Sequence, residues 1–208
     1  MTIKFSNNTE EAGRSMVEML GVLAIVGVLS IGGITGFSKA MAKYKLDKTL
    51  NQISMIITNV HTTFGDQYSY AGLTTSTAVT YNIIGDDLSR GTSGDDLELT
   101  NAFNGNVTIQ AVTTAEGTTN CNVTNERYVN TTYCPFFKLT YTGLPQQACI
   151  EIATSDWGGS AISSLISIKV NSTLFTWTGE HKIPISFSAA NTACNKMDDT
   201  NSLTWIYQ

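Results

Sequence analysis

The side chains that most often carry chemistry in proteins are few in this 208-residue sequence. Its cysteines and histidines are Cys121, Cys134, Cys149, Cys194, His61 and His181. A catalytic nucleophile needs an activating base at hydrogen-bond distance, and the sequence contains no GxSxG, HExxH or phosphate-binding glycine motif. The sequence therefore predicts no catalytic residue, and we do not expect the chain to be an enzyme.

The four cysteines are better explained as disulfides. An even number of cysteines is typical of an exported domain, and four of them allow three pairings. We favour Cys149–Cys194 with Cys121–Cys134, which closes one long and one short loop. Zinc is the alternative, but the sequence has no CxxC pair to supply closely spaced ligands. We expect neither a metal nor a cofactor.

Pairs of neighbouring aspartates are a second place where a cation could bind. They are Asp86–Asp87, Asp95–Asp96 and Asp198–Asp199. Calcium requires six to eight oxygen ligands, and charged side chains in polar loops are usually solvated. Solvation is therefore the expectation for these pairs, and calcium binding is the alternative.

A long apolar segment lies near the N-terminus. Residues 19–38, MLGVLAIVGVLSIGGITGFS, carry no charge, and twenty helical residues match the roughly 30 Å hydrocarbon core of a bilayer. A cleaved secretory signal peptide is the main alternative, but its apolar core is usually about 7–15 residues long. Because the run here is longer and a helical pattern follows it, the sequence predicts a membrane-spanning helix.

The following segment has the pattern of an amphipathic helix. Its apolar residues are spaced 4, 3, 4, 3 and 4 apart, at Leu46, Leu50, Ile53, Ile57, Val60 and Phe64. No proline interrupts residues 14–64, and Gly65 is a suitable stop. We expect one helix over 14–64, with a membrane half (14–38) and an amphipathic half (39–64) that packs on the rest of the chain.

The remaining sequence predicts a β-rich head. Residues 65–106 are expected to be a long loop region with a short helix near 95–103. Strand-like runs occupy 107–113, 136–142, 148–154, 165–170, 174–177, 185–188 and 203–207. A long N-terminal helix packed on an antiparallel sheet is an α+β fold. The head is residues 107–208.

Charge is divided unequally between these parts. Residues 1–48 contain six Lys or Arg and four Asp or Glu, a net charge of +2, whereas residues 49–208 contain six and thirteen, a net charge of −7. A nucleic-acid-binding surface is usually strongly basic. We therefore predict no contact with nucleic acid.

The sequence around the start of the apolar run resembles the signal of type IV prepilins. In GRSMVEMLGVLAIVGVLSIGGITGF, Gly13 precedes the expected cut and Glu18 is the fifth residue after it. The resemblance implies that a prepilin peptidase removes the leader, residues 1–13, by cutting between Gly13 and Arg14. It also implies N-methylation of Arg14. Glu18 would neutralise the amino terminus of a neighbouring subunit during filament assembly.

The head is similar to that of type IVb pilins, including the conjugative thin-pilus kind. The similarity rests on ELTNAFNGNVTI, FFKLTYTGLPQQACIEI and ANTACNKMDDTNSLTWIY. It implies that Cys149 and Cys194 bound a surface region, residues 149–194, that contacts partners. The implied function is a structural subunit that forms a homo-oligomeric helical pilus for adhesion, aggregation or conjugation.

The resemblance also implies partners and a location. Prepilin peptidase and an assembly machinery would act on a precursor in the inner membrane, and the product would be an extracellular pilus. We expect the leader inside and the head outside, although four lysines follow the apolar run, against the positive-inside rule. Two alternatives remain: a pseudopilin or minor pilin of a type II secretion-like machine, and a membrane-anchored monomeric binding protein.

Overall fold

The computed structural model describes residues 9–67, 69–85, 88–93, 96–117, 121, 133–158 and 164–208. They belong to two compact units, Met1–Tyr44 and Lys45–Gln208. Helix α1 (Thr9–Phe64) contributes its first part to one unit and its last part to the other. The helix includes residues 9–13 in addition to the expected 14–64. Thr9, Glu10 and Glu11 at its start are residue types that favour a helix N-terminus.

The first unit is an exposed apolar helix. Its large apolar side chains from Met16 to Phe37 are 53–72% exposed, and α1 is the helix of the described residues that is long and apolar enough to cross a membrane. The hydroxyls of Ser30 and Ser38 donate to the carbonyls of Val26 and Ile34 at 2.7 and 2.9 Å. These polar groups are therefore satisfied within the helix, as a lipid environment requires.

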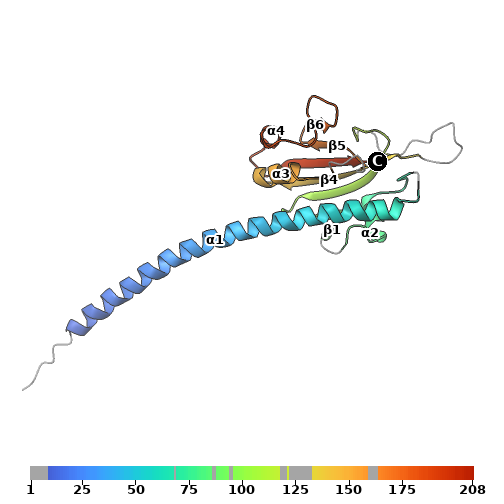
Figure 1. Ribbon diagram of the computed structural model, residues 1–208. Helices are drawn as coiled ribbons and strands as arrows, with labels where there is room; N and C mark the ends of the chain where they lie inside the picture. Colours follow the sequence, from blue (N-terminus) through green and yellow to red (C-terminus); the bar gives the residue numbers. More distant parts are fainter. Residues whose placement is uncertain are drawn as a thin grey trace, which may run out of the picture. The chain divides into compact units, whose positions relative to one another are not determined.

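The second unit is built on an antiparallel sheet (Figure 1). Its described strands are β1 (Ser89–Ser93), β2 (Asp96–Thr100), β3 (Asn106–Val112), β4 (Phe136–Leu144), β5 (Leu165–Val170), β6 (Thr173–Thr176) and β7 (Asn201–Tyr207). They lie in the order β1-β2-β3-β4-β7-β5-β6. The C-terminal strand β7 thus lies between β4 and β5, so the end of the chain completes the middle of the sheet.

Two segments that we expected to be strands are helices. Residues 148–154 belong to α3 (Gln146–Ala153), and residues 185–188 lead into α4 (Phe187–Ala193). Pro145 precedes α3 with φ −56°, and proline is well suited to the start of a helix. Ser186 caps α4 by accepting a hydrogen bond from the Ala189 amide. These start signals prevail over the alternating apolar residues that suggested strands.

The region expected to be a long loop contains regular structure. It forms α2 (Thr75–Thr80), which begins with a capping box between Thr74 and Thr77. It also forms the β1–β2 hairpin, so the short helix expected near 95–103 is instead strand β2. The strand pairs with β1 over five residues and buries Leu99. Cross-strand pairing therefore decides the conformation of this segment.

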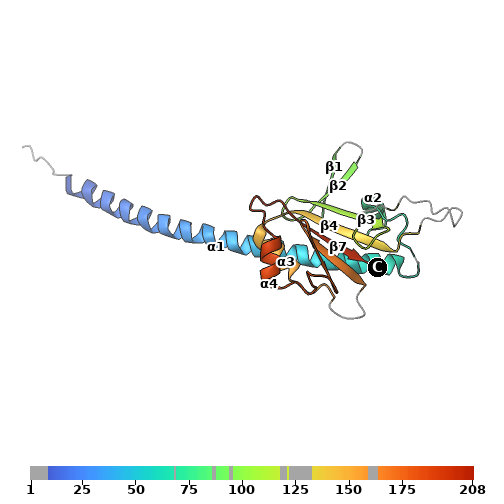
Figure 2. The ribbon, with the colours of Figure 1, turned by 90° about the horizontal axis from the view of Figure 1, so that it is seen from above.

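The last part of α1 packs on one face of the sheet, and β4 and β7 lie over it when viewed from above (Figure 2). The buried stripe of the helix is Leu46, Thr49, Gln52, Ile53, Ile56, Val60 and Phe64. Leu50 and Ile57, which belong to the apolar pattern expected from the sequence, are only half-buried. The helix is therefore turned so that the polar Thr49 and Gln52 enter the core. Each apolar side chain of the stripe contributes about 1.5–3 kcal/mol when fully buried.

Candidate assembly helix and disulfide-bounded head

Three residues expected to act in processing and assembly lie on α1. The Gly13–Arg14 bond and Glu18 are both within Thr9–Phe64. The Glu18 side chain is exposed among apolar neighbours, with Val17 at 72% and Met19 at 63% exposure. It has no polar partner among the described side chains. An ionised carboxylate in an apolar environment is costly unless a cation neutralises it, so Glu18 is suited to pair with a cation on another molecule.

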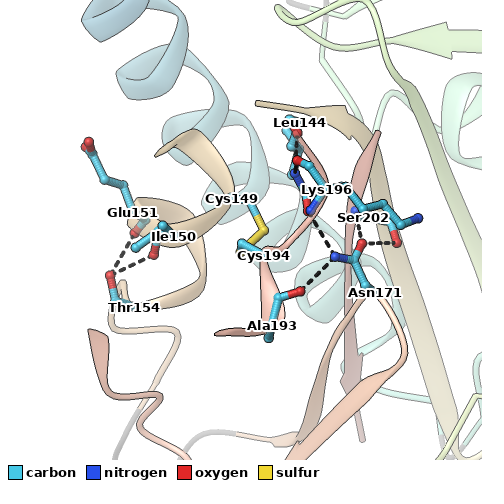
Figure 3. The surroundings of a disulfide bond; sticks show 11 residues. Leu144, Cys149, Ile150, Glu151, Thr154, Asn171, Ala193, Cys194, Lys196 and Ser202 are labelled. Carbon is cyan, nitrogen blue, oxygen red and sulfur yellow. Dashed lines mark hydrogen bonds between the residues drawn. A yellow bond between two sulfur atoms is a disulfide. The ribbon is translucent and has the colours of Figure 1, made fainter. Parts of the chain in front are cut away.

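The Cys149–Cys194 disulfide joins α3 to the end of α4, with the two Cα atoms 5.9 Å apart (Figure 3). Both cysteines are fully buried. Cys149 lies on the buried face of α3, and Cys194 is the C-cap of α4. The two helices are short and have no strand pairing, so they would not be stable alone. The disulfide therefore holds them together.

Hydrogen bonds from two asparagine side chains hold the C-terminal end of α4 to the sheet. Asn171, in the β5–β6 turn with φ 52°, donates from Nδ2 to the Ala193 carbonyl at 2.8 Å (Figure 3). Its Oδ1 accepts from the Ser202 amide at 2.9 Å. The fully buried Asn201 donates from Nδ2 to the carbonyls of Leu144 and Lys196 at 3.1 and 2.7 Å. These two asparagines were not anticipated, because only the folded chain shows that their amides meet.

The second disulfide, Cys121–Cys134, lies at the other end of the head. Its Cα atoms are 5.9 Å apart, and residues 122–132 between the cysteines lie outside the described residues. The amide of Cys134 donates to Ser69 Oγ at 2.9 Å, and its carbonyl accepts from the Tyr70 amide at 2.9 Å. The bond is thus anchored to the segment that follows α1. Both disulfides have the pairing that we favoured from the sequence.

His61 joins α1 to the sheet and is not arranged for catalysis. Its Nε2 is 2.9 Å from Ser164 Oγ, and its Nδ1 is 3.4 Å from the hydroxyl of Tyr70, where a catalytic triad would have a carboxylate. Its ring makes edge contacts with Phe137 and Tyr207 at centroid distances of 5.4 and 5.7 Å. Burial lowers the pKa of His61 below its usual 6.5. Nothing in the sequence signals Ser164 as its partner.

The remaining candidate metal ligands do not converge. The ring of His181 packs against the ring of Phe175 at a centroid distance of 5.3 Å. Asp198 accepts a hydrogen bond from Thr200 at 2.6 Å, which lowers the pKa of its carboxyl, and Asp198 and Asp199 are both exposed. Among the described residues, no three His, Cys, Asp or Glu side chains form a group that could hold a metal ion.

The other two aspartate pairs are described only in part. Asp86, Asp87 and Asp95 lie outside the described residues. Asp96 begins strand β2.

Comparisons with known proteins agree with this architecture. The family model named Bundlin matches residues 38–208. The major structural subunits of bundle-forming pilus from Escherichia coli O111:H- and O127:H6 (strain E2348/69 / EPEC) are 26% and 25% identical to the chain over 211 residues. Each alignment covers 99% of both proteins.

A solved structure shares the fold. The crystal structure of type IV b pilin from Salmonella typhi superposes with a TM-score of 0.52 at 20% identity, covering 76% of this chain and 97% of that one. The family match spans the whole sheet and both disulfides. The chain belongs to the Bundlin family and is a pilin subunit of the type IV, type IVb-like kind.

Proposed function

We propose that this chain is processed between Gly13 and Arg14 and then polymerises through α1 into a helical pilus with its head outward. The observation that carries the proposal is the contrast along one helix. Its apolar first half is exposed over residues 16–38, whereas its last part is buried against the sheet. The exposed half has the apolar surface that a membrane, and later a bundle of identical helices, would cover.

Glu18 sets the register in this proposal. Processing creates a new amino group at Arg14, four residues before Glu18, and methylation would keep its positive charge. A carboxylate and an ammonium that are buried together cost much less than either alone. Each Glu18 therefore pairs with the amino terminus of a neighbouring subunit, and this pairing fixes how far one helix slides along the next.

Other components complete the cycle. A prepilin peptidase removes residues 1–13 from the precursor in the inner membrane, and an assembly machinery extracts the helices into the growing filament. The assembled pilus is extracellular, where two disulfides are stable. The relatives are subunits of a bundle-forming pilus, which supports lateral association of filaments for this chain too.

Residues 149–194 form the partner-binding part of the head in this proposal. The Cys149–Cys194 disulfide and the Asn171 network hold the region to the sheet. Exposed side chains on it, such as Phe187 at 70% exposure, are available for contacts in adhesion, aggregation or conjugation.

Mass spectrometry of the N-terminal peptide tests processing. We expect sheared filaments from the native host to yield a peptide that begins at Arg14 and carries a methyl group. An N-terminus at Met1 or Thr2 that is confined to membranes would contradict the proposal and favour a membrane-anchored monomeric protein. A processed peptide that never leaves the cell envelope would instead favour a pseudopilin.

Substitution of Glu18 tests assembly. Glu18→Ala should leave the processed subunit at normal levels in membranes but remove it from sheared surface fractions. Glu18→Asp, which keeps the charge, should assemble better than Glu18→Ala. Normal filament yield from the alanine variant would show that neutralisation by Glu18 is not required.

A further inference from the structure

The face of the sheet opposite α1 carries two lysines, one in a row of threonines and one beside the buried Ile206. Lys138 alternates along β4 with Phe137 and Leu139, which face the core, so it lies on the outer face. Cross-strand register aligns Thr108, Thr140, Thr204 and Lys169 in one row. Lys138 lies in the adjacent row, beside Ile206. Figure 2 views the sheet from this side.

The two lysines are not neutralised within the described part of the head. Lys138 Nζ donates to the Gly117 carbonyl at 3.2 Å, and neither Lys138 nor Lys169 forms an ion pair with a described residue. Partial burial, and then the positive charge of Lys169, lower the pKa of Lys138. The two lysines share one face of the sheet, in adjacent rows on strands β4 and β5 that both pair with β7. An anion placed between them would therefore be attracted by both.

The sequence around this face has the opposite charge. Among residues 49–208, the described acidic side chains with known exposure all lie at the surface, namely Asp66, Glu98, Glu116, Glu151, Asp156, Glu180, Asp198 and Asp199. Residues 49–208 have a net charge of −7, so two heads repel each other at long range. Close approach of two copies therefore requires a cationic surface on one and an acidic surface on the other.

Asp198 and Asp199 fit this role. They are adjacent, exposed and located in the turn before β7, with Asp199 at φ 55°. Next to them, Met197 is 87% exposed, so the turn projects from the surface. Two adjacent carboxylates match two lysines in charge. The other acids of residues 107–208, such as Glu151 on α3, are separated from each other along the chain. The pairs Asp86–Asp87 and Asp95–Asp96 lie wholly or partly outside the described residues.

We propose that the outer face of the sheet, through Lys138 and Lys169, docks the Asp198–Asp199 turn of a second copy of this chain in a neighbouring filament. The inference rests on the proposed assembly into pili. A single exposed ion pair contributes only about 0–1 kcal/mol. Because a filament repeats the contact along its length, many weak pairs add up to stable lateral association.

A polyanion such as duplex DNA is the other occupant to consider. Proteins that hold DNA by charge alone neutralise roughly 6–10 phosphates, whereas this face presents two lysines. Residues 49–208, with a net charge of −7, would also repel a nucleic acid. The second copy is therefore the better match.

The experiment uses sheared filaments of the full chain from the native host. High-speed centrifugation measures total filament, and low-speed centrifugation measures the fraction in bundles, between about 0.1 and 1 M NaCl. Over this range the Debye length falls from about 10 to about 3 Å. We expect the bundled fraction of the wild type to fall as the salt rises.

The test variant is K138Q/K169Q, and K182Q is its control, with K169Q alone giving the comparison at equal charge. Lys182 is an exposed lysine of the same head and is not next to the Asp198–Asp199 turn. At about 0.1 M NaCl the test variant should form normal amounts of filament but a bundled fraction at least about fivefold lower, because the loss is multiplied over repeated contacts. The control should stay within about twofold of wild type, since it leaves the docking face intact.

A charge exchange identifies the partner surface. K169E should abolish bundling, and K169E/D199K should restore at least half of it. Unchanged bundling in K138Q/K169Q, equal loss in the control, or no rescue by D199K would overturn the inference. Duplex DNA binding by the same filaments is measured in parallel. Loss of DNA binding in K138Q/K169Q without loss of bundling would also overturn the inference. Absence of filaments from the wild type would instead refute the assembly proposal itself.

Discussion

Asn171 Nδ2 donates a hydrogen bond to Asn201 Oδ1 at 2.9 Å, although the two residues are thirty positions apart. Asn201 Oδ1 also accepts from the Lys196 amide at 3.1 Å. Between them the two side chains bind the end of β4, the end of α4 and the start of β7. The disulfide-bounded region of this pilin is thus held by buried amides as well as by sulfur.

Asn201→Ala tests how much the amide network contributes. The substitution leaves the buried carbonyl of Leu144 and the part-buried carbonyl of Lys196 without the Asn201 amide, and an unsatisfied buried group costs about 1–3 kcal/mol. We expect the free energy of unfolding to fall by about 3 kcal/mol, measured by near-ultraviolet circular dichroism of the detergent-solubilised chain in urea. Asn191→Ala, at an exposed position of α4, is the control and should change little. Equal stability of the two variants would rule out the network as a major tether.

The disulfides should differ in their contribution to stability. Cys149–Cys194 closes a loop with a sequence separation of 45, whereas Cys121–Cys134 has a separation of 13. Loop-closure entropy predicts losses of about 4 and about 3 kcal/mol, respectively, when each bond is removed. Paired Cys→Ala variants compared by urea unfolding would measure both values. A larger loss from the Cys121–Cys134 pair would contradict the entropic account.

The stability of the head should depend on pH through His61. Because burial lowers its pKa in the folded state from 6.5, the unfolded chain binds the proton more readily. Stability is then complete above about pH 6.5 and decreases as the pH falls through the folded-state pKa. The facing groups Tyr70, Tyr207 and Ser164 carry no charge in this range. His61→Gln should flatten the pH profile of unfolding between about pH 7 and 5, and an unchanged profile would assign the dependence to other groups.

Tyr141→Phe should stabilise the protein. The Tyr141 hydroxyl is buried without a hydrogen-bond partner in the described structure, and burial raises the pKa of Tyr141 far above its usual 10. Removing an unpaired buried hydroxyl is expected to gain about 1 kcal/mol.

Tyr207→Phe is the matched control for that substitution. The Tyr207 hydroxyl donates to the Trp157 carbonyl at 3.2 Å, so its removal should cost about 1 kcal/mol. Thermal unfolding followed by circular dichroism would reveal the opposite signs. A loss of stability in both variants would mean that the Tyr141 hydroxyl is satisfied in solution.

The local pattern of the sequence determined the parts of this pilin whose signals are strong and uninterrupted. The charge-free run over 19–38 and the apolar spacing over 46–64 predicted the long helix, because helical periodicity persists over many turns. Strands β3, β4, β5, β6 and β7 were predicted to within two residues at each end, since β-branched and aromatic residues dominate them. The motif at Gly13 and Glu18 pointed to the family that the comparisons then showed.

Only the tertiary structure decided the features that depend on residues far apart in sequence. α3 and α4 are too short for propensity to identify, and burial around Cys149–Cys194 stabilises them as helices. The face of α1 that enters the core was chosen by the sheet, which brings in Thr49 in place of Leu50. Lys138 and Lys169 come to neighbouring rows of one face because β7 pairs with both of their strands. Local sequence carries no record of such register, since it is set by packing against the whole sheet.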